Sequence, residues 1–188
     1  VEEAWVGFRK SGWDVRVGAQ MLNWSATEAF HPADIMNSRN LDSDIESPEK
    51  MGEVMLSVKR RIGNGSLMVF LMPRYESPQF PSSKSRLNFL PAGMTVGDAL
   101  WVEADGKIAS GDYGLQWGAR FTRTIGPADV SVHMIRHQDR HQPVMLFDPT
   151  ATLLRPLYLP VTDIGGTYLQ VLGGWIVKLE YNYRNFDN

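Results

Sequence analysis

The sequence predicts an all-β fold: an antiparallel transmembrane β-barrel with about eight long strands. Three observations support this prediction. Polar and apolar residues alternate with a period of two, which is typical of strands with two unlike faces. Short turns and long loops follow one another strictly along the chain, as in outer-membrane barrels. Aromatic residues recur near both ends of the strands, where a barrel meets the two lipid interfaces.

Composition agrees with this fold class and excludes several others. The chain has 188 residues, enough for one domain with a sizeable core. Its 19 Lys and Arg against 21 Asp and Glu give a net charge of -2, so no strong field indicates nucleic acid as a partner. With no Cys, disulfides and thiolate metal sites are excluded. No apolar run is long enough for a transmembrane helix.

The strands are expected at residues 2–10, 13–22, 52–61, 66–74, 112–124, 128–137, 163–172 and 175–184. The clearest pattern is DYGLQWGARFT at 112–122, where Leu115, Trp117 and Phe121 alternate with Gln116 and Arg120. A soluble sheet would bury the Leu/Trp/Phe face, whereas a membrane barrel would place it in lipid. The strand at 66–74 fits less well, because it is apolar on both faces.

The two faces of these strands predict two sets of residues. The residues expected in the lumen, facing a solute, are Asp14, Arg16, Gln20, Lys59, Gln116, Arg120, Lys178 and Glu180. The residues expected to face lipid are Val15, Val17, Leu115, Trp117, Val177 and Leu179. Mixed charges across a pore select solutes by charge. A salt-bridged interior that conducts nothing explains the same residues, and both interpretations stay open.

The connections predict how the strands are joined. Ser11-Gly12, Gly173-Gly174 and the stretch 125–128 mark tight turns, and Asn64-Gly65 is typical of a type I′ hairpin turn. Between the hairpins lie long segments at 23–51, 75–111 and 138–162, which are uncommon in compact soluble domains. The first should fold over or into the mouth of the barrel. The middle one has a hairpin signal at Asp105-Gly106.

With this order of short turns and long loops, both chain ends lie on the long-loop side. Bacterial outer-membrane barrels instead keep both ends beside the short turns. We therefore expect an internal piece of a larger barrel. A closed eight-stranded barrel is the alternative, if one strand at each end is miscounted.

Residue types that could carry chemistry give weaker signals. His133, His137 and His141 recur every four residues, but on a strand His133 and His137 lie about 13 Å apart and share no ion. We expect no metal and no cofactor. No phosphate loop or nucleophile elbow appears, so no enzyme is expected. Two alternatives stay open: a soluble β-sandwich binding module, and an outer-membrane hydrolase with Ser, His and an acid at the rim.

Two stretches resemble a known family. Residues 13–40 contain VGAQMLNW followed by FHPADIMNSRN, and the segment from 49 to 87 contains EKMGEVMLSVKRRIGNGSLMVFLMPRY. They resemble large proteobacterial outer-membrane β-barrel proteins, porin-like and known mainly as a domain of unknown function. The resemblance covers about residues 1–87. Ser38 and Asn40 stand where that family has Pro and Asp, which leaves Arg39 as the matched loop charge. Asp34 is the other candidate residue of this loop.

The resemblance implies a bacterial outer-membrane location and a barrel architecture, and it implies no ligand. Together with the strand pattern it predicts porin-like passage or uptake of a small solute, hydrophobic or anionic. Outer-membrane lipid and lipopolysaccharide are the expected partners, and nucleic acid is not expected. The sequence carries no signal for an oligomeric state.

Overall fold

The computed structural model describes residues 2–103, 105–110, 113–141 and 143–187. Within these ranges all regular structure is β-strand, so the prediction of an all-β chain is confirmed. No helix among the described residues is long and apolar enough to cross a membrane.

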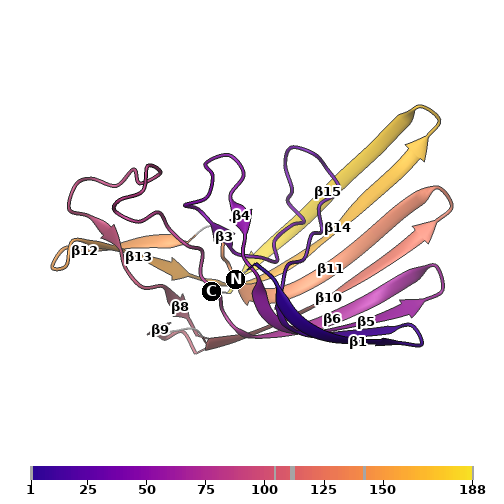
Figure 1. Cartoon of the computed structure of the whole chain (residues 1–188), viewed down its shortest axis with the longest axis horizontal. Coiled ribbons are helices and arrows are strands. Elements are labelled where there is room, and N and C mark those ends of the chain that lie inside the picture. Colours follow the sequence, from indigo (N-terminus) through magenta and orange to yellow (C-terminus); the bar gives the residue numbers. More distant parts are fainter. Residues whose placement is uncertain (1, 104, 111–112, 142, 188) are drawn as a thin grey trace.

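Eight long strands form one antiparallel sheet in which each strand pairs with its neighbours in the chain (Figure 1). They are β1 (Ala4–Lys10), β2 (Trp13–Gln20), β5 (Glu53–Ile62), β6 (Gly65–Arg74), β10 (Tyr113–Ile125), β11 (Ala128–Gln138), β14 (Pro160–Leu172) and β15 (Trp175–Phe186). The largest departure from the sequence expectation is β14, which begins at Pro160 instead of 163.

Four tight turns join these strands in pairs, at the end of the sheet away from the long connections (Figure 1). The expected type I′ turn at Asn64-Gly65 is wrong by one residue, because Ile62 pairs with Gly65 and the turn residues are Gly63 and Asn64. Gly63 has a φ of 55°, and Asn64 is not among the residues with positive φ. Positive φ at the first central position alone is the pattern of a type II′ turn, which requires glycine there.

The three long connections carry short strands of their own. The first holds β3 (Arg39–Asn40) and β4 (Glu49–Lys50), and the second holds β7 (Thr95–Val96), β8 (Leu100–Val102) and β9 (Ile108–Ser110). The third was expected to be a loop but forms a hairpin of β12 (Val144–Asp148) and β13 (Leu153–Tyr158). The expected hairpin near Gly106 is confirmed, since β8 and β9 pair around it.

The second and third connections join in a small sheet beyond the end of the main sheet (Figure 1). β13 pairs in parallel with β7 and with β8, which ties the two connections together. Tyr75, Trp101 and Tyr158 form its buried aromatic cluster, with Tyr75 and Tyr158 ring centroids 5.0 Å apart.

The main sheet has an inner face, which the first long connection covers, and an outer face. The inner face includes the cross-strand row from Ser57 through Phe70, Gly118 and Ile135 to Asp163. The core lies here, between the sheet and residues 21–38, which we name the covering segment. The core residues are Trp24, Ile35 and Met36 from this segment and Met55, Phe70, Met72 and Ile135 from the sheet.

This core explains why β6 is apolar on both faces. Phe70 and Met72 point inward and are buried, whereas Leu67, Val69 and Leu71 point outward and stay exposed. The inward-facing apolar residues of β6 therefore belong to the core, and the outward-facing ones belong to the exposed outer face.

The main sheet is bent, and its first and last strands do not meet (Figure 1). Among the described residues β1 pairs only with β2 and β15 only with β14, so the sheet is open. The alternative of a closed eight-stranded barrel within this chain is therefore wrong. Two long strands are left with one unpaired edge each.

Candidate functional site

The inner face gathers the polar side chains of the main sheet. One cross-strand row runs from Asp14 through Lys59 and Met68 to Arg120 and His133. The predicted lumen residues all lie on this face: Asp14, Arg16, Gln20, Lys59, Gln116, Arg120, Lys178 and Glu180.

These residues fall into separate groups along the strands. Near the turns, Asp14 accepts hydrogen bonds from Arg16 at 3.0 Å and from Arg9 at 2.6 Å. At the far end of β2, beside the first long connection, the buried Gln20 side-chain oxygen accepts a bond from the Ser57 hydroxyl at 2.8 Å. Lys59 stays exposed. The turn end of the inner face is therefore charged and exposed to solvent, whereas the part toward the long connections is packed.

A buried ion pair closes the inner face where it meets the small outer sheet. Arg140 Nε lies 3.3 Å from a carboxylate oxygen of Glu53, and its Nη2 donates to the side chain of Gln116 at 2.8 Å. Glu53, Gln116 and Arg140 are at most 4% exposed. The guanidinium also lies over the ring of Tyr75, 5.4 Å from its centroid. The third long connection is thus linked to β5 by an ion pair and to β10 by a hydrogen bond.

A second buried group lies on β11, β14 and β15. His137 Nε2 lies 2.5 Å from an Asp163 carboxylate oxygen, and Asn182 donates to the other oxygen at 2.8 Å. Arg184 contacts both Asp163 and Asp139. A buried charge is stable only when it has partners, and Asp163 has His137, Asn182 and Arg184. Both groups favour a packed interior in this region over an open passage.

Glu180 of β15 binds the covering segment to the sheet. The Glu180 carboxylate accepts bonds from the backbone N–H groups of Ala26 at 2.5 Å, Thr27 at 2.8 Å and Ala33 at 3.1 Å. The Thr27 hydroxyl donates to it as well, at 2.9 Å. Hydrogen bonds to a charged acceptor are stronger than neutral ones. Lys178 on the same strand pairs with Glu28, so β15 anchors this segment twice.

Trp24 fills the inner face under the covering segment. Its ring centroid lies 5.1 Å from that of His133 and 5.9 Å from that of Phe70. The guanidinium of Arg120 lies 4.9 Å from its centroid, a cation–π arrangement, and donates to the Ser131 hydroxyl at 3.1 Å. Trp24 therefore occupies the space in front of a predicted lumen cation.

Asp34 organises the outer end of the covering segment. Its carboxylate lies 2.6 Å from Lys50 Nζ and 3.4 Å from Arg39 Nη2. Burial lowers the pKa of the Lys50 ammonium, and the ion pair with Asp34 opposes that shift. The two loop residues of the sequence prediction, Asp34 and Arg39, thus contact one another. Their arrangement is structural, since both bind groups of the same connection.

The predicted lipid-facing residues lie on the outer face. Val17, Leu115, Trp117 and Leu179 are exposed, and Val15 and Val177 are half-buried. One apolar row crosses all eight strands of this face: Phe8, Val15, Val58, Val69, Ala119, Met134, Ile164 and Tyr183.

Sequence reasoning missed Trp24 and the two buried ion groups. Trp24 lies in a polar stretch with no periodicity, so its only signal was a lone large aromatic residue. Glu53 and Arg140 are far apart in the chain, and only the pairing of strands brings them together. The spacing of His137 in the sequence indicated no partner for it, and the structure gives it a carboxylate partner from the next strand.

The geometry was compared with a metal site and, at His137, with the Ser–His contact of a hydrolase. In the part of the chain that the structure describes, no group of three or more His, Asp or Glu could hold a metal ion. The described His137 ring bonds to Asp163, Gln138 and Arg140, and no Ser hydroxyl bonds to it.

Compared with protein-family models, curated proteins and solved structures, the chain matches none of them. The outer-membrane family of the sequence resemblance therefore stays a prediction.

Proposed function

We propose that the main sheet is part of the wall of a transmembrane β-barrel in a bacterial outer membrane, with its outer face in lipid. The observation that carries this proposal is the outer face itself, which is apolar across all eight strands and uncovered by the described chain. Val6, Leu115 and Val132 are 82%, 71% and 60% exposed. Contiguous apolar surface of this extent is rare on soluble monomers.

The two unlike faces support the same proposal. Outer-membrane barrels alternate lipid-facing apolar residues with polar residues that face the lumen. Here the inner face carries the mixed charges and the outer face the aliphatic belt. A soluble β-sandwich would need Leu115, Trp117 and Leu179 buried under a second layer, yet all three are exposed.

The open edges support a wall that is wider than this sheet. The unpaired edges of β1 and β15 present free backbone N–H and C=O groups, which lipid cannot satisfy. We propose that further antiparallel strands pair with both edges, as in the large barrels that the sequence resembles.

The proposed activity is porin-like passage of a small solute, with the covering segment as a plug. Residues 21–38 lie against the inner face and are held by Glu180 and Trp24. Passage then requires this segment to move or to leave space beside it. Arg16, near the turns, and Arg120, beside Trp24, would act on the charge of the solute.

Depth measurement in a membrane tests the lipid-facing assignment directly. Because the chain has no Cys, single-cysteine variants can be labelled with a fluorophore at one place. Val69→Cys and Val132→Cys lie on the outer face, and Ser57→Cys and Ser131→Cys are inner-face controls on β5 and β11. In vesicles with brominated acyl chains, we expect quenching of the outer labels only. Equal quenching of both sets, or quenching of neither, would contradict the proposal.

A further inference from the structure

Two adjoining hollows lie in the outer part of the long connections, away from the inner face of the main sheet. One has a volume of about 570 Å³ and the other about 460 Å³. Both fall within the range of roughly 300–1,000 Å³ typical of small-molecule sites. They share five lining residues: Phe80, Pro81, Asn88, Leu90 and Val96. Because of these shared residues, a single elongated ligand can contact both.

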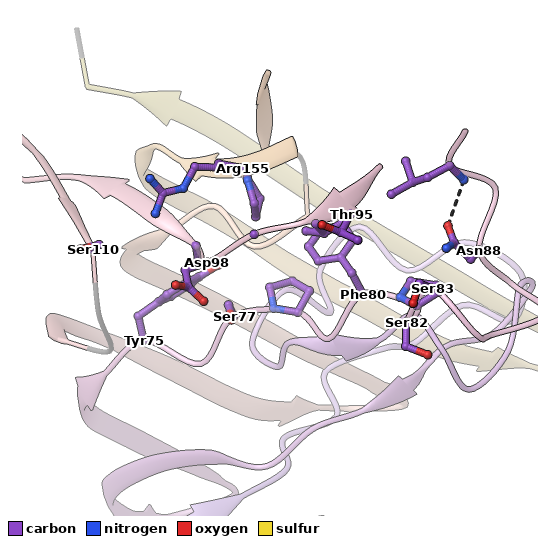
Figure 2. Close-up of a pocket in the computed structure, with 17 residues that line it drawn as sticks. Tyr75, Ser77, Phe80, Ser82, Ser83, Asn88, Thr95, Asp98, Ser110 and Arg155 are labelled. Carbon is purple, nitrogen blue, oxygen red and sulfur yellow. Dashed lines mark hydrogen bonds between the residues drawn. The ribbon is translucent and has the colours of Figure 1, made fainter. Parts of the chain in front are cut away.

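The larger hollow is polar (Figure 2). Arg155 of β13 and Asp98 lie toward one end of it, Ser82 and Ser83 lie toward the other, and Phe80 lies between. Arg155 Nε is buried and has no hydrogen-bond partner among the described residues. A buried N–H donor without a partner is costly, and a ligand acceptor would remove that cost.

The smaller hollow is apolar. The residues that line it and not the polar hollow include Leu41, Ile45, Leu87, Phe89, Met145 and Leu154. Phe89 is 76% exposed and Ile45 65%, so apolar surface remains open to solvent here. An alkyl chain in this hollow would remove such surface from water.

We propose that the two hollows form one binding site for an amphipathic glycoside, with its hydroxyl-rich head in the polar hollow and its alkyl chain in the apolar one. A hydroxyl both donates and accepts, so a sugar head can serve Arg155 and Asp98 together. A carboxylate head would meet the negative charge of Asp98, and an ammonium head would meet Arg155. This binding goes beyond the proposed passage and does not require it.

Calorimetry on the chain in lipid nanodiscs tests the ligand class, with empty nanodiscs as the baseline for partitioning into lipid. The probes are octyl glucoside below its micelle concentration, glucose, octanoate and octyltrimethylammonium. We expect octyl glucoside to bind at least about tenfold more tightly than each of the others, since each lacks one complementary half. No binding above the baseline, or glucose or octanoate binding as tightly, would overturn the proposal.

Two substitutions test the location. Arg155→Gln alters only the polar hollow and Met145→Asp only the apolar one, and each should weaken octyl glucoside binding about tenfold or more. Lys107→Gln and Leu146→Asp are matched controls, because both residues lie in the small outer sheet or its turn and line neither hollow. Unchanged affinity in both test variants would refute the site. Solute passage through vesicles is measured separately, so its failure would contradict only the proposed function.

Discussion

Glu180 on the last strand accepts two hydrogen bonds from Thr27 of the covering segment, one from its backbone N–H at 2.8 Å and one from its hydroxyl at 2.9 Å. The backbone N–H groups of Ala26 and Ala33 donate to the same carboxylate. One carboxylate on the inner face thus binds the covering segment at three of its residues. The covering segment is thus attached at a few strong points over a packed core.

Replacing this carboxylate should loosen the segment without unfolding the sheet. In Glu180→Gln the acceptor loses its charge, and each charge-assisted bond is worth about 1.5–3 kcal/mol. We expect hydrogen exchange at the amides of Ala26, Thr27 and Ala33 to accelerate at least about tenfold. Glu46→Gln, at an exposed position in the same long connection, is the control. Equal exchange rates in both variants would show that Glu180 does not hold the segment.

Removing the Trp24 side chain should destabilise the inner core. It is 3% exposed and packs against Phe70 and His133, so Trp24→Ala leaves a cavity that costs about 3–5 kcal/mol. Urea unfolding of the reconstituted chain measures this loss. Phe30→Ala is the matched control, because Phe30 belongs to the same segment but is 78% exposed, and it should change stability little.

A charge on the outer face should be costly if that face lies in lipid. We expect Val69→Arg to lower the free energy of unfolding in vesicles by about 2–4 kcal/mol, the cost for a charge near the bilayer midplane. Val144→Arg provides a close comparison, because Val144 lies in the outer hairpin and both valines are 45% exposed. Its change should stay within about 0.5 kcal/mol. Similar costs at the two positions would argue against lipid contact.

Charge reversal on the inner face should alter ion selectivity if solutes pass there. In planar bilayers, we expect the double variant with Arg16→Glu and Arg120→Glu to shift the reversal potential toward the equilibrium potential of the cation. Arg123→Glu is the control, because Arg123 lies on the same strand as Arg120 but on the outer face. An unchanged reversal potential in the double variant would remove both arginines from the pathway.

The aromatic cluster of the small outer sheet should show delayed ionisation at high pH. Burial raises the pKa of Tyr158 to about 12, and burial also raises the pKa of Tyr75 beside it. The neutral phenols therefore stabilise the folded sheet fully below the unfolded pKa of about 10, and this contribution is lost as pH rises through the folded value. Absorbance at the phenolate band should show a late step that Tyr158→Phe reduces. A titration unchanged by this substitution would contradict the assignment.

The strands and their faces could be predicted from the sequence because alternation is local. DYGLQWGARFT alone separates Leu115 and Trp117 from Gln116 and Arg120, and the structure keeps them on opposite faces. The turn was predicted at Asn64-Gly65 but forms at Gly63-Asn64. Both dipeptides are typical of turns, and only the register of the paired strands decides between them. The hairpin of β12 and β13 was missed because its strands are short and its pairing with β8 is long-range.

By itself, the sequence determined the all-β class, the eight long strands and the alternation of short and long connections, since these depend on residue periodicity and turn chemistry within a few positions. Only the tertiary structure decided what the inner face holds. Trp24 over His133, Glu53 with Arg140, and Glu180 with the covering segment are contacts between residues distant in the chain. Such contacts leave no local pattern, because their energy comes from burial and charge pairing that exist only once the strands have paired.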